Sequence, residues 1–348
     1  MSGDDRSQPR IPRRGSKRLT PTRLVVTLAA CVVACAAIAM LAPLVGVTLD
    51  HHLEILPPAA FDPASPGHEL VAVRLPRVLA ALLLGAALSG AGCALQALLR
   101  NPLAEPFTLG ISSGASLAAV LATQLGIAGW GVNAAALVGA VGTLVIVARL
   151  ARVGRQLPPA TLVLAGVTIS MVCSSIGVII QCTADFADGN RILAWMVGGF
   201  DSTRIADAQL AAIPIGVALV GLVGSARSLD ALAAGPELAA SLGVAVGRTQ
   251  VIVFGLASLL VGMAVAVAGP IGFVGLVVPH AMRALVGSDH RVLLPASMLG
   301  GAALLVTCDT LARTVLATHL PAGAVTAVLG GVFFLGILVA RKRKASFA

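Results

Sequence analysis

Long apolar runs separated by short polar segments make up most of this chain. The first run extends from Leu24 to Val47. Further runs follow at about 78–99, 107–125, 131–148, 158–182, 206–224, 249–269, 271–286, 292–311 and 323–340. Most approach the roughly 20 residues that a helix needs to cross a bilayer, and they lack the short alternating segments of a transmembrane barrel. The pattern predicts an all-α polytopic membrane protein with about ten transmembrane helices.

The first run is an uncleaved span in this interpretation. A signal peptide is the competing explanation, with Ala37-Ile38-Ala39 as its cleavage site. A signal sequence has an apolar core of only about 7–15 residues, and this run is longer. We therefore expect a basic cytoplasmic tail over 1–23, followed by the first membrane span.

Composition and charge agree with a membrane protein. The chain is 57% hydrophobic and 11% charged, with 38 glycines and a mean hydropathy of +0.96, whereas soluble domains carry about 25% charged residues. With the N-terminus placed in the cytoplasm, 19 of the 24 Lys and Arg residues fall on that side. This bias predicts that both termini are cytoplasmic. It also explains the net charge of +9 without a nucleic-acid partner.

Catalytic and metal-binding patterns are scarce. The chain has no GxxxxGK[ST] loop for ATP and no Cys/His spacing of a metal site. Gly110 to Gly114 matches the G-x-S-x-G of a hydrolase, but close helix packing explains its small residues better. Few ionisable groups fall inside the spans, which disfavours an ion-coupled secondary transporter. We expect neither a catalytic site nor a resident metal.

Two polar segments sit at the ends of predicted spans. Arg74 and Arg77 lie at the expected outer start of the second span, spaced to share one helix face. They either anchor the helix end or receive carboxylates from a partner. The turn from Arg100 to Pro106 lies at the inner side, where it is either a rigid connection or a polar mouth.

The longest inner loop predicts two short amphipathic helices. Leu232, Leu238, Ala239 and Leu242 recur at helical spacing, and Gly235-Pro236 marks a break between the helices. A helix that rests on lipid would carry Lys or Arg on its polar face. None occurs from 231 to 247, so docking into another protein is favoured.

Many motifs, in order along the chain, resemble the FecCD family of permease subunits. They are Arg74-Leu-Pro-Arg77, Gly85-Ala-Ala-Leu88, Arg100-Asn-Pro-Leu-Ala104, Leu164-Ala-Gly166, Glu237-Leu-Ala-Ala-Ser-Leu-Gly243, Gly269-Pro-Ile-Gly-Phe-Val-Gly-Leu276, Pro279-His280 and Asp309 with Arg313. This family serves ABC importers of iron–siderophore, haem and vitamin B12. The resemblance covers about 70 to 345.

The resemblance implies a type II ABC importer permease fold, with 24–345 as a single transmembrane domain. It implies a dimer of permease chains, most simply a homodimer, with two ATP-binding subunits that hold ATP and Mg. A periplasmic or lipid-anchored substrate-binding protein would dock outside the bacterial inner membrane. This chain would hold no cofactor and would not itself be an enzyme. The expected cargo is an iron–siderophore first, then haem, then vitamin B12; the alternative function is an ion-coupled secondary transporter.

The same resemblance assigns roles to individual residues. Docking of the binding protein falls to Arg74, Arg77 and Arg313. The inner gate falls to Asn101 and Leu103, opposed by Pro159, Ala160 and Thr161. Coupling helices at about 228–244 would contact the ATPase through Glu237, Leu238, Ala239, Ser241, Leu242 and Gly243. The fifth and tenth spans would line the path. The chain departs from the family at His319, where Glu is usual, and at Gly330–Phe334, which lacks a usual Pro.

Overall fold

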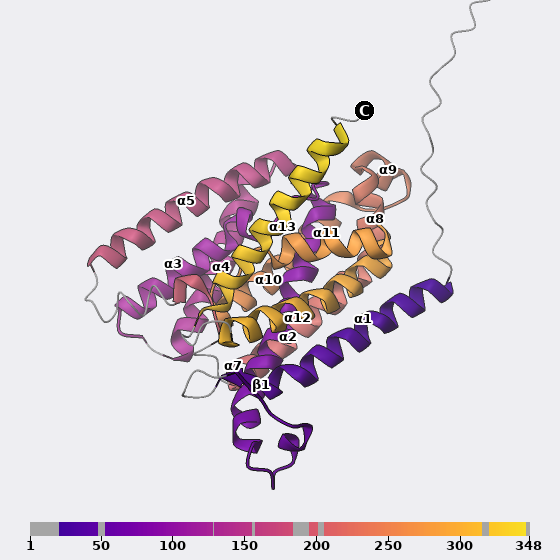
Figure 1. Ribbon diagram of the computed structural model, residues 1–348. Coiled ribbons are helices and arrows are strands. Elements are labelled where there is room, and N and C mark those ends of the chain that lie inside the picture. Colours follow the sequence, from indigo (N-terminus) through magenta and orange to yellow (C-terminus); the bar gives the residue numbers. More distant parts are fainter. Residues whose placement is uncertain are drawn as a thin grey trace, which may run out of the picture.

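The computed structural model describes residues 21–47, 53–127, 129–154, 157–183, 195–200, 205–314 and 320–345. Each of the ten predicted runs falls on a helix (Figure 1). These helices are α1 (Pro21–Leu41), α2 (His68–Leu98), α3 (Ile111–Gln124), α4 (Trp130–Ala151), α5 (Pro159–Thr183), α7 (Ile205–Gly224), α10 (Val246–Ala268), α11 (Val274–Val286), α12 (His290–Thr314) and α13 (Ala322–Ala345). The helical membrane architecture is confirmed. Most of the predicted tail over 1–23, and His319, lie outside the described residues.

Seven helices in the described part of the chain are long and apolar enough to cross a membrane unaided. Helix α3 has only 14 residues and α11 only 13. Hydropathy did not show that these two helices are short, because the residues that precede each of them are apolar but not α-helical. Pro106–Leu109 forms a 3-10 helix, η3, and Phe273 begins α11 at a φ of 67°. Irregular backbone at membrane depth is tolerated where protein buries it or where it lines a cavity.

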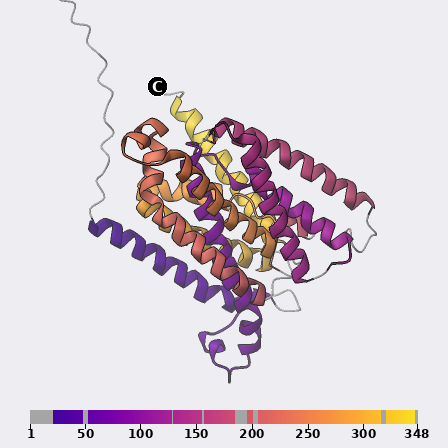
Figure 2. The same cartoon turned by 180° about the vertical axis from the view of Figure 1, so that it is seen from behind.

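Helix α2 lies at the centre of the bundle, and most of it is buried, as are most of α10 and α12. Helices α1 and α5 stand at opposite edges in both views (Figures 1 and 2) and are mostly uncovered. Helix α2 runs against α12, and Gly85 of α2 faces the backbone of Gly301. A side chain at either glycine would collide with the opposite helix, so the absence of Cβ atoms permits this close contact.

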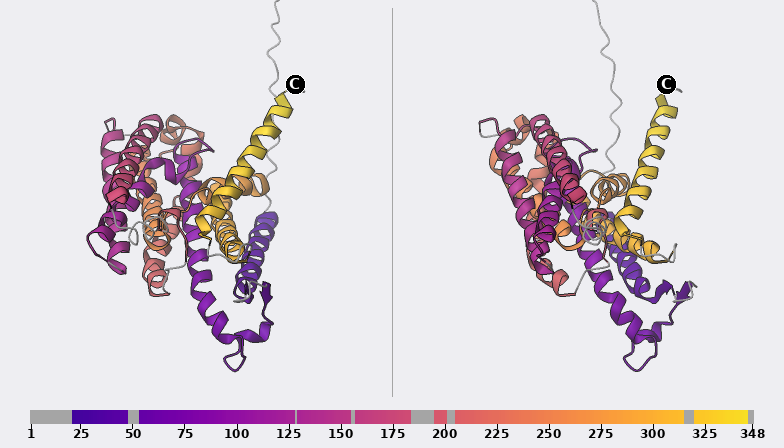
Figure 3. Two further views of the ribbon diagram at one scale, coloured as in Figure 1. Left: turned by 60° about the vertical axis from the view of Figure 1, so that its left-hand side comes forward. Right: turned by 90° about the vertical axis from the view of Figure 1, so that its left-hand side faces the viewer.

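A small substructure precedes α2. We call its end of the bundle the outer end and the opposite end the inner end, following the sides that the distribution of Lys and Arg predicts. It contains the antiparallel strands β1 (Val45–Val47) and β2 (Leu53–Ile55), flanked by the 3-10 helices η1 (Ala42–Leu44) and η2 (Pro58–Phe61). Figure 3 shows it projecting from one end of the bundle. Helix α2 then starts at His68, ten residues before the predicted start at 78. The polar residues and Pro76 interrupted the apolar pattern there, but not the helix.

Two short helices occupy the opposite end of the molecule. They are α8 (Ala226–Ala234) and α9 (Pro236–Ser241), and Gly235 separates them with a φ of 132°. This confirms the predicted break. In Figure 1 both helices lie at the upper right, away from β1.

Candidate functional site

The three arginines assigned to docking meet at the outer end of α2 and α12. The Asp309 side chain is 1% exposed and lies between two of them. Arg77 Nε lies 2.7 Å from Asp309 Oδ1, and Arg313 Nε lies 3.2 Å from Asp309 Oδ2. Arg74 Nη2 lies 3.6 Å from Glu54 Oε2 of β2. A buried carboxylate between two guanidiniums satisfies charges that would otherwise be costly in this setting.

The same arginines fasten the outer substructure to the bundle. Arg74 Nη1 donates to the carbonyl of Pro43 at 3.2 Å, and Arg313 Nη2 donates to that of Ala42 at 3.3 Å. Because α2 begins at His68, Arg74 and Arg77 lie well inside this helix rather than at its start. Cations at a helix N-terminus oppose the helix dipole, and the earlier start of α2 at His68 removes this conflict for both arginines.

A cavity of about 450 Å³ lies among α3, α5, α13 and irregular segments of the bundle. Its lining includes Cys173 and Ser174 of α5 and Ala324 of α13, the two helices that the resemblance assigns to the path. The short helical segment that contains Met196 and Val197, together with the non-helical chain around Pro270, completes one wall. Most lining side chains are small or apolar.

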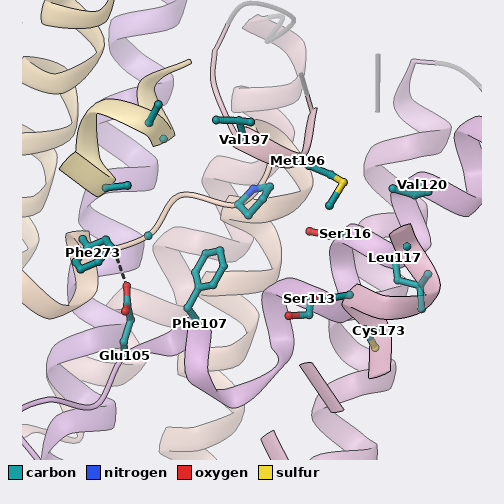
Figure 4. A pocket seen from close by; sticks show the side chains of 17 residues that line it. Glu105, Phe107, Ser113, Ser116, Leu117, Val120, Cys173, Met196, Val197 and Phe273 are labelled. Atoms are coloured by element: carbon teal, nitrogen blue, oxygen red, sulfur yellow. Dashed lines mark hydrogen bonds between the residues drawn. The ribbon is translucent and has the colours of Figure 1, made fainter. Parts of the chain in front are cut away.

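Glu105 is the one charged residue among the described residues that line this cavity (Figure 4). Its carboxylate accepts a short hydrogen bond from the Phe273 N–H at the start of α11. Burial raises the pKa of the Glu105 carboxyl, and this hydrogen bond opposes the rise. Sequence reasoning missed Glu105 because it placed the whole turn from Arg100 to Pro106 at the inner surface. In the sequence, Glu105 lies between Pro102 and Pro106, shortly before Gly110 at the start of the next helix. This placement was the available signal.

The predicted gate residues lie at the inner end. Asn101 and Leu103 are exposed, and Asn101 Oδ1 accepts a hydrogen bond from the Leu103 N–H at 3.0 Å. This contact makes the turn rigid. At the start of α5, Ala160 and Thr161 are exposed, and the Thr161 hydroxyl donates to the Pro158 carbonyl at 2.9 Å. Pro159 lines a small pocket of about 150 Å³ together with Arg100 and Pro236, so the turn and the start of α5 lie close together.

The two coupling helices differ in their exposure. Ala226, Leu229 and Leu232 of α8 are buried against the bundle. On α9 only Ala239 is buried, while Leu238 is 49% and Leu242 is 65% exposed. Glu237, Ser241 and Gly243 are exposed beside them. The apolar face of α8 packs on α2 and α12, so of the two predicted amphipathic helices α9 is the one with exposed apolar side chains.

Gln96 links α2 to α11 near the inner end. Its buried amide nitrogen donates to the Gly275 carbonyl at 3.3 Å, and its oxygen accepts from Arg283 Nη2 at 3.1 Å. Arg283 thus makes a side-chain contact between helices. Its motif neighbour His280 stacks edge-on against Phe333 of α13, with 6.2 Å between ring centroids.

A bundle of apolar helices around a cavity lined by small side chains defines the class of this molecule: a membrane permease. The chain belongs to the FecCD transport family, whose pattern matches residues 30–340.

Curated relatives agree with this assignment. The chain is 40% identical to the cobalamin import system permease protein BtuC of Halobacterium salinarum, over 78% of this chain and 74% of that protein. It is 39% identical to the vitamin B12 import system permease protein BtuC of Escherichia coli, over 78% of this chain and 83% of that protein.

Solved structures show the same fold. An inward-facing transporter described as of the metal-chelate ABC type superposes with a TM-score of 0.80. It is 28% identical and covers 91% of this chain and 99% of its own. PsaBC from Streptococcus pneumoniae, at 16% identity and a TM-score of 0.54, shares the fold alone. The chain has the fold of an ABC importer permease, as the resemblance implied.

Proposed function

We propose that this chain is the membrane-spanning subunit of an ATP-driven importer of a metal chelate in the bacterial inner membrane, with both termini in the cytoplasm. The observation that carries this proposal is a pair of exposed leucines, Leu238 on α9 and Leu242 directly after it. They form an apolar patch on a short polar helix, which fits a groove on another protein better than it fits lipid. Two ATP-binding subunits hold the ATP and Mg, and two copies of this permease make the path.

The proposed cargo is a corrinoid of the vitamin B12 type. Relatives at 39–40% identity bear that name, which moves our preference from an iron–siderophore to cobalamin. The cavity supports a weakly held cargo, because its small, mostly uncharged lining offers few groups that would retain a substrate. The substrate-binding protein, which docks at Arg74, Arg77 and Arg313, supplies the specificity for the cargo. The residues at 101–103 and 159–161 form the inner gate.

Affinity purification of the tagged chain from its native membranes tests the importer class. We expect native mass spectrometry to find two copies of the chain with two copies of an ATP-binding subunit. Leu238→Asp should remove the ATP-binding subunits, because it places a charge in the centre of an apolar contact. Val153→Asp, at another exposed apolar position just after α4, should leave the complex intact. Recovery of the wild-type chain without any ATP-binding subunit would refute the proposal.

Uptake into vesicles that contain the purified complex tests the cargo. Labelled cyanocobalamin, a ferric hydroxamate chelate and haemin are offered in turn, with ATP and the cognate binding protein. We expect ATP-dependent uptake of cyanocobalamin only. Uptake of the ferric chelate or of haemin instead would retain the importer class and replace the cargo.

A further inference from the structure

A partly buried hydrogen-bonded pair, Asp230 and His290, joins α8 to the first residue of α12. Asp230 Oδ1 lies 2.6 Å from His290 Nδ1 and also accepts a hydrogen bond from the His290 N–H at 2.9 Å. The His290 side chain is 5% exposed. In the described part of the chain its other ring nitrogen, Nε2, is buried and has no hydrogen-bond partner. Asp230 alone therefore sets the orientation of this ring.

Asp230 lies on α8, which contacts α2, α7 and α12, and it makes the polar contact from this helix to α12. Helix α9 is connected to α8, whose Leu229 and Leu232 are buried against neighbouring helices. Movement of α9 therefore reaches the bundle through α8 as well as through its own contact with α10. Burial raises the pKa of the Asp230 carboxyl, but the hydrogen bonds and charge of His290 outweigh it and the pKa is lowered.

Helix α12 extends this connection across the membrane. From His290 to Asp309 it rises about 28 Å at 1.5 Å per residue. Along this length it runs against α2 through the close contact between Gly85 and Gly301. At the far end Asp309 binds Arg77 of the same helix α2. Helix α12 is thus held by a carboxylate contact at each end, one near the coupling helices and one at the outer arginines.

We propose that Asp230 and His290 are positioning residues that transmit movement of the coupling helices to α12 and so to the outer arginine cluster. This inference rests on the proposed function, because it requires an ATPase that loads α9. Packing alone would let α8 slide along α12. The Asp230 carboxylate binds both the ring and the backbone of His290, so it fixes the position of α8 relative to the first turn of α12.

Labelling of Cys308 measures the movement without knowledge of the cargo. Cys308 is buried in α12 beside Asp309, at the end opposite to His290. The purified complex is treated with a thiol reagent, with and without a nonhydrolysable ATP analogue, and mass spectrometry reports the labelling rate at this residue. We expect the nucleotide to change this rate in the wild-type complex.

Asp230→Ala and His290→Leu should reduce that nucleotide-dependent change about tenfold, as expected for loss of a charged hydrogen bond. His290→Asn should restore it, because its amide can donate in place of Nδ1. The double variant should be no worse than either single variant, since both remove one interaction. Arg227 is exposed on α8, the helix that carries Asp230. Arg227→Gln is the matched control and should behave as wild type.

Two results would overturn the inference. One is a wild-type labelling rate that does not respond to nucleotide. The other is a wild-type response in Asp230→Ala complexes that still contain the ATP-binding subunits. If either apolar variant fails to assemble, Asp230→Asn and His290→Asn carry the comparison: loss of response with Asp230→Asn and retention with His290→Asn is the expected order. Failure of the wild-type chain to bind any ATPase would instead refute the proposed function.

Discussion

At the residue scale, the outer arginines depend on a single buried carboxylate. Asp309 lies between Arg77 and Arg313, and both guanidiniums are largely buried. Removing one partner of a buried ion pair typically costs about 3–5 kcal/mol, because the remaining charge stays buried without compensation. We expect Asp309→Asn to lower the thermal midpoint of the purified chain strongly.

Glu54→Gln is the matched control for Asp309→Asn. The Glu54 side chain is 31% exposed and pairs with Arg74 at 3.6 Å. Partly exposed pairs contribute up to about 1 kcal/mol, so the midpoint should change little. Equal losses for the two variants would contradict the assignment of Asp309 as the central charge.

Arg74 offers the cleaner test of docking. Arg77 is bound to Asp309, which is 1% exposed, whereas Arg74 pairs with Glu54, which is 31% exposed. Replacing Arg77 would therefore disturb the fold more than replacing Arg74, although Arg74 also holds the carbonyl of Pro43. Arg74→Gln should weaken binding of the cognate substrate-binding protein about fivefold at low salt, as for a surface ion pair. The difference from wild type should shrink at high salt, because salt screens exposed charges. Biolayer interferometry at two ionic strengths measures both effects, and an unchanged affinity at low salt would exclude Arg74 from the interface.

At the scale of elements, periodicity and apolar length predicted each helix but misjudged several ends. The apolar run of α2 was placed from 78, with Arg74 and Arg77 at the helix start, because Arg74, Pro76 and Arg77 interrupt the apolar pattern. The helix begins earlier, at His68, and the two arginines are satisfied by Glu54, Asp309 and the chain at Pro43. The irregular segment before α11 was invisible because its residues are apolar. These errors share a cause: tertiary partners decide whether a polar or irregular segment is stable, and a sequence does not display them.

Close helix contacts give a test at this scale. Gly92 of α2 lies against the backbone of Gly275 at the start of α11, and an added Cβ would overlap it. We expect Gly92→Ala to destabilise the chain by about 1–3 kcal/mol, as for overpacking in a core. Gly255→Ala in α10 has open space around it. It should be neutral or slightly stabilising, because alanine favours helix over glycine. Chemical denaturation in detergent compares the two, and similar effects would contradict the close packing of α2 and α11.

At the scale of the whole molecule, the sequence indicated which helices line the cavity but not how far the connecting turns reach into the bundle. The resemblance identified α5 and α13 as lining helices, and residues of both do line the cavity. The inner turn was expected wholly at the surface, yet Glu105 reaches into that cavity. Depth depends on how the chain folds back between α2 and α3, which local hydropathy does not report. Ion coupling was disfavoured because few ionisable groups fall inside the predicted spans, and Glu105 gives that alternative a residue to test.

Glu105→Gln separates the two transport mechanisms. In an ATP-driven importer the carboxylate holds the start of α11, and the amide oxygen of Gln can accept the same hydrogen bond from Phe273. Uptake into vesicles should then keep its dependence on ATP and remain unaffected by ionophores. In an ion-coupled transporter the same substitution would remove the group that binds the ion, so transport would stop. Such a loss, with binding of the ATP-binding subunits unchanged, would favour ion coupling.

The pH dependence of stability provides an independent check on the same residue. Because burial raises the folded-state pKa of Glu105 above its unfolded value, the folded protein binds this proton more tightly than the unfolded chain does. The protein should therefore gain stability as the pH falls through the folded-state pKa toward the ordinary value for glutamate. Glu105→Gln should lose that part of the pH profile while it retains ATP-driven uptake. An unchanged profile would mean that Glu105 is well solvated, and the cavity would then contain no buried charge for an ion-coupled mechanism to use.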